Sequence, residues 1–567
     1  MKDSDPKTPV SPQGVSLPAL LPNYPARWLK HYEDGFLAAV EQAKAIQIYT
    51  NGVLKYLGEF SAPFWIALGA FSSTEKQKLM QVNPLESMSD YLELLRFNQQ
   101  VAEKGLASTL ESMNLFHARK ASERFFAWLN TLLGRESEDL GVFTARQREL
   151  IETVVNGYPQ AIRDIKPEYG FDFEHGDYLK VAETERFLLY QVFPLEDGIN
   201  IREDGKPIII LPPYVLGANI LAFLPGEGKS YVHCFANQGI PTYIRIQKDI
   251  NTTPAVQTMT GEDDARDTRH FCETLMQRHG RKVTLNGFCQ GGFIATLDLL
   301  SGELDGLVDA LITCVTPMDG TRSKSLIEYL SHLPPRFRDL GYAVKTLPNG
   351  NQVVDGSVMS WVYKLKSMES EAPLFSLYRD LMMFDRPGGK KVTISKTAAA
   401  INHWLIYERN DLPVAITQLS FDSYTRPVEK DGTLPVKLFG RPLNFKRLAE
   451  KGIRFLICYA EKDNLVDPEA VLAPLDFIDA EVTVFPKGHG AIATSWSLPT
   501  DCIVHNGKTS PNLLCSRGAS QACRINHCGA ENCRGPVRFQ LDLEEELQAP
   551  APKPRRGARS ATAKRPK

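Results

Sequence analysis

The stretch from residue 283 to residue 297 constrains the fold of this chain more than any other. It begins with Val283-Thr284-Leu285, which predicts a buried strand, and it ends with the run FIATL, which predicts a helix. The turn between them, GFCQGG at residues 287–292, contains three glycines that permit a strained backbone and close packing of helix on strand. We therefore expect a nucleophile elbow, a sharp turn that presents one reactive side chain at the edge of a sheet.

Cys289 stands at the reactive position of this turn. The N-terminus of the following helix favours a thiolate there, because its partial positive charge stabilises an anion. The backbone N–H of Gln290 is a predicted oxyanion donor, and a second donor is expected from the loop after Ile208–Leu211, near Tyr214. The alternative is that Cys289 is a buried thiol with a packing role only, as free cysteines usually are.

Two later predicted strands end next to residues that would complete a catalytic triad. Asp463 follows the strand at 455–458, and His489 follows the strand at 482–485. The chain order of nucleophile, acid and histidine is that of the α/β-hydrolase triad, whose members lie on loops at strand ends. Asp467 is a competing acid, but it precedes Pro468 at the expected start of a helix, so we prefer Asp463. A purely structural His489 is the alternative.

Short apolar segments that predict strands alternate with helical stretches such as Asp263–Arg278 and Gly292–Leu300. This alternation is typical of a mostly parallel sheet covered by helices on both faces. The predicted fold class is therefore α/β, an α/β-hydrolase fold with a cap insertion, preceded by a helical N-terminal domain. The predicted strands are Phe187–Val192, Ile208–Leu211, Thr242–Ile246, Val283–Leu285, Leu311–Val315, Phe455–Cys458 and Val482–Phe485.

Changes in composition predict five parts of the chain. Residues 1–24 are rich in proline and expected to be flexible, and residues 25–176 form a helical domain, with one helix starting at Ser89-Asp90. Its apolar run Ala62–Phe71 reads as a buried helix or as a docking surface for a lipid-like body. Residues 177–497 form the catalytic domain, in which about 320–427 are a cap insertion over the site. A cysteine-containing segment (498–548) and a disordered basic tail (549–567) complete the chain.

The charge balance excludes a basic binding face on the main body. The net charge is −2, and the tail from Ala549 to Lys567 holds seven basic residues and no acid, so the remainder is net acidic. The tail is a solvated extension or a weak contact for a polyanion. No export signal is found, and Pro212-Pro213 interrupts the longest apolar run, so we expect no membrane span and a cytoplasmic location.

The ten cysteines are therefore expected to be reduced thiols. Five of them lie between residues 502 and 533 without any C-x-x-C pair, so we expect no metal there, with a zinc site as the alternative. These five are Cys502, Cys515, Cys523, Cys528 and Cys533.

Several motifs resemble those of the poly(3-hydroxyalkanoate) synthases. The G-x-C-x-G-G box at 287–292, the run DNLV at 463–466 and the pair Gly488-His489 match that family, as do LPPY at 211–214 and NDLP at 410–413. The resemblance covers roughly Tyr178 to Thr494. It departs from the family at Phe293, where the family usually has Thr, and at residues 247–250, where it usually has a Trp-Arg-Asn-Pro-like run.

The resemblance implies an acyltransferase that polymerises 3-hydroxyacyl-coenzyme A through an acyl thioester on Cys289, with His489 as base and Asp463 as its partner. It implies no cofactor apart from the coenzyme A thioester, which is the substrate. The implied partners are hydroxyacyl-coenzyme A, the growing polyester and a second copy of the chain as a homodimer, at a polyester granule in the cytoplasm. Two rivals are a thioesterase or esterase on the same fold and a non-catalytic granule scaffold.

Overall fold

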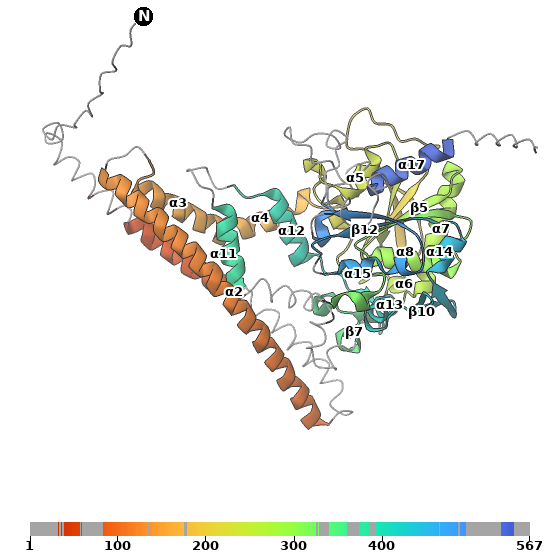
Figure 1. Cartoon of the computed structure of the whole chain (residues 1–567), viewed down its shortest axis with the longest axis horizontal. Coiled ribbons are helices and arrows are strands. Elements are labelled where there is room, and N and C mark those ends of the chain that lie inside the picture. The colour runs from red at the N-terminus through yellow and green to blue at the C-terminus, as the bar shows by residue number, and fades with distance from the viewer. Residues whose placement is uncertain are drawn as a thin grey trace, which may run out of the picture. The chain divides into compact units, whose positions relative to one another are not determined.

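The computed structural model divides into two compact units, and Figure 1 shows the whole chain. The helical unit comprises Met1–Trp65, Asn98–Asp164 and Lys364–Ala399, and the α/β unit comprises Ile66–Phe97, Ile165–Tyr363 and Ala400–Lys567. The structure describes residues 32, 36, 39–56, 58, 83–133, 137–174, 178–324, 327, 340–359, 373–385, 393–463, 465–485, 488–494 and 534–548. In these ranges no helix is long and apolar enough to cross a membrane.

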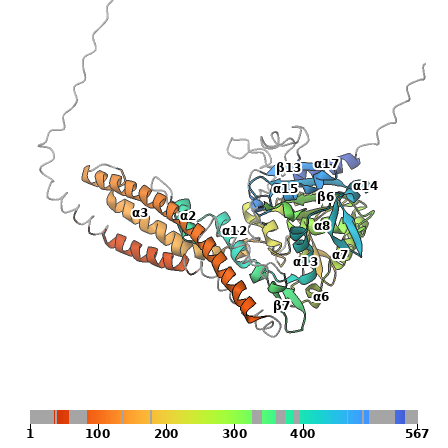
Figure 2. The ribbon, with the colours of Figure 1, turned by 60° about the horizontal axis from the view of Figure 1, so that its bottom comes forward.

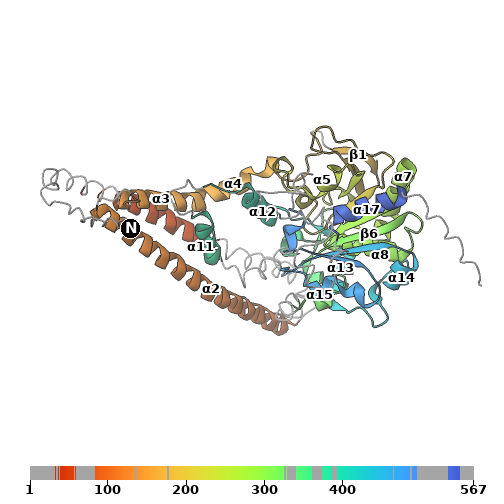
Figure 3. The same ribbon diagram turned by 45° about the horizontal axis from the view of Figure 1, so that its top comes forward.

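An eight-stranded sheet in the order β1-β2-β4-β3-β5-β6-β12-β13 forms the centre of the α/β unit (Figure 3). The pairs β1–β2 and β2–β4 are antiparallel, and every later pair is parallel. This strand order is that of the α/β-hydrolase fold, so the predicted fold class is confirmed. The strands are β1 (Tyr178–Glu183), β2 (Phe187–Val192), β3 (Ile208–Leu211), β4 (Thr242–Gln247), β5 (Val283–Phe288), β6 (Val308–Cys314), β12 (Arg454–Ala460) and β13 (Glu481–Phe485).

Helices connect the parallel strands. Crossovers between parallel strands are right-handed. Helix α5 leads from β3 back to β4, whereas α7 and α8 lead in the other direction, to β5 and β6. Helix α5 therefore lies on the opposite face of the sheet from α7 and α8. Helix α13 packs beside α7 (Figure 2). The helices of this unit include α5 (Tyr231–Ala236), α6 (Pro254–Gln257), α7 (Gly261–His279), α8 (Gln290–Ser301), α13 (Val414–Thr425), α14 (Lys446–Glu450), α15 (Pro468–Val471) and α17 (Pro536–Gln548).

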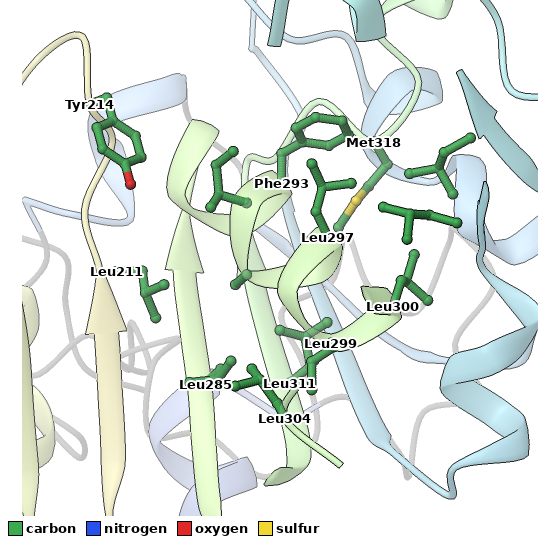
Figure 4. Close-up of a cluster of buried hydrophobic side chains, with 14 of the residues drawn as sticks. Leu211, Tyr214, Leu285, Phe293, Leu297, Leu299, Leu300, Leu304, Leu311 and Met318 are labelled. Carbon is green, nitrogen blue, oxygen red and sulfur yellow. The ribbon is translucent and has the colours of Figure 1, made fainter. Parts of the chain in front are cut away.

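Helix α8 is buried along its whole length. Figure 4 shows its side chains Phe293, Leu297 and Leu300 in one cluster with Leu285 of β5 and Leu311 of β6. All five are buried, which removes their apolar surface from water and contributes about 1.5–3 kcal/mol for each large side chain. The core therefore fixes the helix that follows the predicted nucleophile.

The sequence-predicted strands agree with the structure to within three residues at either end, and the antiparallel edge strand β1 was not predicted. The predicted helix start at Ser89-Asp90 is wrong, because α2 runs over Pro84–Leu133. The side chain of Asn83 accepts the N–H of Leu85 at 3.0 Å, and Pro84 takes the first helical position, which suits proline.

The α/β unit extends beyond the predicted catalytic domain at its C-terminal end. Helix α17, whose acidic run was expected to belong to a separate segment, packs on β12. Its Gln540 donates to the Lys206 carbonyl at 2.8 Å, and Glu544 accepts the Lys206 N–H at 3.0 Å. Glu544 also pairs with Arg202 at 2.5 Å, so one ion pair and two hydrogen bonds to the Lys206 backbone dock the helix.

The helical unit takes part of the predicted cap insertion. Helix α11 (Pro373–Phe384) belongs to this unit with α3 (Leu140–Glu152) and α4 (Tyr158–Asp164), whereas β8 (Gln352–Val354) and α13 belong to the α/β unit. Asp380 of α11 accepts from the Tyr56 hydroxyl at 2.9 Å, and Asp385 pairs with Lys120 at 2.7 Å and Arg146 at 3.1 Å. These pairings hold the segment against the N-terminal helices, so the insertion is divided between the two units.

A buried network of charges joins β4, α7 and α8. Arg245 donates to Asp264 Oδ1 and to the Thr268 hydroxyl, both at 2.7 Å, and Thr268 donates to Asp298 at 3.0 Å. Burial, together with the charge of Asp264, raises the pKa of Asp298 well above its ordinary value. Burial and the charge of Asp264 therefore favour the neutral form of Asp298, while Asp264 pairs with the Arg245 guanidinium.

This charge assignment predicts different effects for two equally buried carboxyl groups. Asp264→Asn would leave Arg245 buried without its counter-ion and should lower the free energy of unfolding by about 3–5 kcal/mol. Asp298→Asn replaces a neutral acid with a neutral amide and should lower it by less than about 1 kcal/mol. Urea-induced unfolding of both variants measures the difference, and equal losses would contradict the neutral state of Asp298.

Candidate active site

Cys289 lies between β5 and α8 in a strained backbone conformation, with φ 51° and ψ −122°. A positive φ is costly for a residue with a side chain and persists only where its surroundings enforce it. Here a Cβ at Gly287 would overlap the backbone of Gly292, and one at Gly292 would overlap Thr316. The Cys289 N–H also donates to the Cys314 carbonyl at 2.8 Å. The glycines and this bond hold the elbow that the sequence predicts.

Asp463 follows β12 and is fixed by its own loop. Its Oδ1 accepts the N–H groups of Leu465 at 2.9 Å and Val466 at 3.0 Å, and its side chain is almost completely buried. The other carboxylate oxygen, Oδ2, accepts from Nδ1 of His489 at 2.7 Å. The structure therefore brings Asp463 to His489, as the sequence predicts, while Asp467 precedes α15 and donates its N–H to Ser323 at 3.2 Å.

His489 begins a short 3₁₀ turn after β13, and its ring lies close enough to Cys289 for that residue to raise the pKa of the imidazole. Burial lowers the pKa of His489, but the charges of Asp463 and Cys289 and the hydrogen bonds to both outweigh burial and raise it to about 10. The imidazole is therefore protonated at neutral pH. The ring of Phe288 meets it edge-on at 6.0 Å between centroids. The geometry is that of an imidazolium between a sulfur and a carboxylate.

The predicted oxyanion donors lie together, but one of them has an internal acceptor. The N–H of Tyr214 donates to the side-chain oxygen Oε1 of Gln290 at 3.2 Å, and the N–H of Val215 donates to it at 3.4 Å. The amide nitrogen Nε2 of Gln290 donates to the Ser420 hydroxyl on α13 at 2.8 Å. The N–H of Gln290 itself is in the first turn of α8, where a backbone N–H has no intrahelical acceptor.

Sequence reasoning missed the roles of Val215, Ser420 and the Gln290 side chain. The separation of 130 residues between Gln290 and Ser420 explains this, because no local pattern links them. The LPPY motif and the elbow predict that the loop at Tyr214 lies near Cys289. They do not predict the direction of the Gln290 side chain.

Two other cysteines lie behind the elbow and are unsuited to nucleophilic chemistry. Cys314 and Cys458 are paired across β6 and β12, and both are completely buried. Burial raises the pKa of the Cys458 thiol well above its ordinary value, and Cys314 raises it further. The Tyr231 hydroxyl lies 3.3 Å from the Cys314 sulfur. A thiol buried in apolar surroundings is poorly suited to attack a substrate, so half-buried Cys289 is the reactive candidate among the cysteines that the structure describes.

Four regions named from the sequence lie outside the described residues: residues 1–24, Ala62–Phe71, the cysteines from Cys502 to Cys533, and the tail 549–567. Within the residues that are described, no group of three or more His, Cys, Asp or Glu could hold a metal ion.

No family model matches the sequence, and no curated protein matches it. Solved structures are similar to about half of the chain. They include a carboxylesterase of the thaumarchaeon Nitrososphaera gargenis, at 14% identity over 56% of this chain and 92% of that chain, with a TM-score of 0.32. Naproxen esterase of Bacillus subtilis gives 10% identity over 60% and 93%, with a TM-score of 0.30. A carboxyl esterase of Bacillus coagulans gives 12% identity over 54% and 89%, with a TM-score of 0.31. The fold assignment therefore rests on the strand order.

The raised pKa of His489 predicts a pH-dependent contribution to stability. The protonated ring is favoured in the folded state, so its contribution is complete below pH 6.5 and is lost as the pH rises through about 10. The difference in unfolding free energy between wild type and His489→Gln should therefore be largest below pH 6.5 and shrink toward pH 10. Denaturant unfolding across this range measures it.

Asp463→Asn is the control, because it removes the carboxylate that raises the pKa of His489. In the Asp463→Asn background, the change in unfolding free energy caused by His489→Gln should lose most of its dependence on pH above pH 7. If the difference in unfolding free energy between wild type and His489→Gln grew as the pH rose, it would contradict a protonated His489 in the folded protein.

Proposed function

We propose that the chain is an acyltransferase that polymerises 3-hydroxyacyl-coenzyme A through an acyl thioester on Cys289. The observation that carries this proposal is the geometry at the strand ends of an α/β-hydrolase fold, where His489 bonds to Asp463 at 2.7 Å and Cys289 at the elbow raises the pKa of the same ring. A cysteine in this position supports transfer, because a thioester bound to sulfur stays activated toward the next hydroxyl group. The match of the motifs to the poly(3-hydroxyalkanoate) synthases supplies the substrate class.

In the first step the thiolate of Cys289 attacks the thioester carbonyl carbon of hydroxyacyl-coenzyme A. The N–H of Gln290 and an N–H of the loop at Tyr214 stabilise the resulting oxyanion. The bond to the sulfur of coenzyme A then breaks, and His489 gives its proton to that leaving sulfur. Cys289 is left as a neutral acyl thioester.

In the second step a hydroxyl group of another hydroxyacyl chain attacks the carbonyl carbon of the Cys289 thioester, and His489 accepts its proton. The bond between the acyl carbon and the sulfur of Cys289 breaks, which forms the new ester and restores the Cys289 thiolate. Acylation removes the negative charge of Cys289, which is one cause of the raised pKa of His489. The histidine gave up its proton in the first step, and the loss of this charge lowers its pKa, so the ring stays neutral and is free to accept the proton of the hydroxyl group. Asp463 keeps the ring oriented and stabilises its positive charge in both steps.

The remaining parts of the proposal concern partners. Those parts of the insertion that lie in the α/β unit would limit the access of water, so that transfer prevails over hydrolysis. Coenzyme A enters only as part of the substrate, and no other cofactor is needed. We further propose a homodimer, a location in the cytoplasm at the surface of polyester granules, and a weak polyanion contact through the tail.

A thioesterase is the second candidate, because the same three side chains could activate water in the second step. Incubation with 3-hydroxybutyryl-coenzyme A and with a medium-chain analogue separates the candidates. Release of coenzyme A together with polymer supports the proposal, and release with free hydroxy acid supports the thioesterase. The absence of any release would leave a granule scaffold.

Cys289→Ser tests the nucleophile. The substitution keeps the shape of the side chain, but a serine hydroxyl stays far from ionised where a thiol with a reference pKa of about 8.5 ionises readily. We expect little change in stability, slow acylation and almost no elongation. Mass spectrometry of trapped wild-type enzyme should place the acyl group on the peptide with Cys289, and a label on Cys314 or Cys458 would contradict the mechanism.

Asp463→Asn tests the acid. By comparison with acid-to-amide changes in other triads, turnover should fall by about 10²- to 10⁴-fold. Asp467→Asn is the matched control and should keep turnover within about threefold, because Asp463 is the acid that pairs with His489. Near-normal synthesis by Asp463→Asn would remove the role assigned to it.

A further inference from the structure

The side chain of Gln290 bridges three parts of the candidate site. Its oxygen Oε1 accepts from the N–H groups of Tyr214 and Val215, and its Nε2 donates to Ser420 of α13. The residue is buried, with 7% of its surface exposed. An uncharged amide oxygen thus lies where the loop after β3 presents two N–H donors, next to the nucleophile.

The loop that carries these donors is fixed from two sides. The Tyr214 hydroxyl hydrogen-bonds to Asp264 and accepts from Arg245 at 3.2 Å, so the residue is anchored in the buried charge network. A Cβ at Gly291 would overlap the carbonyl oxygens of Leu211 and Pro212, which shows how closely α8 packs on the loop. The donors therefore cannot become free through movement of the loop, and only the Gln290 side chain can leave.

We propose that the Gln290 carboxamide is an internal stand-in for the substrate carbonyl, which must displace it from the N–H groups of Tyr214 and Val215 before Cys289 can be acylated. This rests on the proposed function only in that Cys289 forms an acyl-enzyme. The carboxamide oxygen is a neutral sp² acceptor like the oxygen of a thioester or ester carbonyl. Gln290 is thus a positioning residue that sets how readily a carbonyl substrate enters.

The hydrogen bond from Gln290 Nε2 to the Ser420 hydroxyl links this side chain to α13. This hydrogen bond stabilises the observed rotamer of Gln290, because Nε2 would lose its acceptor if the side chain moved away from the N–H groups of Tyr214 and Val215. Loss of the Ser420 hydroxyl should therefore favour the open position. The site becomes competent only in the fraction of molecules in which the carboxamide has left, and the apparent affinity for substrate falls by that fraction.

The test uses the burst of p-nitrophenol from p-nitrophenyl butyrate, an activated ester that reports acylation without coenzyme A or chain growth. Gln290→Met keeps the length of the side chain and removes both polar atoms. If the resting site is open in about a tenth of molecules, the half-saturating concentration of the burst should fall about tenfold. The maximal acylation rate should stay unchanged, since saturating substrate displaces the carboxamide in the wild type.

Ser420→Ala should lower the half-saturating concentration in the same direction by a smaller factor, and it tests the proposal should Gln290→Met fail to fold. Gln418→Met, on the exposed surface of the same helix, is the matched control and should leave both parameters unchanged. A lower maximal rate at an unchanged half-saturating concentration in Gln290→Met would overturn the proposal, as would an unchanged value in both variants. If wild-type Cys289 is not acylated at all, the proposed function itself is wrong.

Discussion

The site depends on the close approach of helix α8 to strand β5 and to the loop after β3. Three glycines make this approach possible, since a side chain at Gly287, Gly291 or Gly292 would overlap neighbouring atoms. The approach forces Cys289 into a positive φ and places the first turn of α8 beside the backbone of Tyr214. One packing contact therefore positions the candidate nucleophile, the helix N-terminus and the candidate oxyanion donors. The buried cluster in Figure 4, which includes side chains of α8, stabilises this contact.

Electrostatics then determines the resting state of the site. His489 lies between a carboxylate and a sulfur, and their attraction for its proton exceeds the effect of burial. A protonated histidine at rest suits a first step in which the leaving sulfur needs a proton. In the proposed mechanism the first step leaves the ring neutral, and the loss of the negative charge of Cys289 lowers the pKa of His489. The ring can therefore donate a proton in the first step and accept one in the second.

The buried network around Arg245 links this site to the stability of the fold. Asp264 balances the guanidinium and also bonds the Tyr214 hydroxyl, so the residue that holds the oxyanion loop is held by a charge pair in the core. The neutral form of Asp298 is favoured because burial and the neighbouring charge of Asp264 both raise the pKa of its carboxyl group. A substitution in this network is therefore expected to change both the stability of the unit and the placement of the loop.

The sequence by itself determined the α/β fold class, most strands and the chain order of Cys289, Asp463 and His489. These are local signals, because strand, turn and helix patterns are written in adjacent residues. It did not determine that α11 belongs to the helical unit, that α17 docks beside Lys206, or that Gln290 bonds to Ser420. Each of these depends on a contact between residues far apart in the chain, and no local sequence pattern identifies the two partners. Only the tertiary structure decided them, because only there do the charges and shapes of distant segments meet.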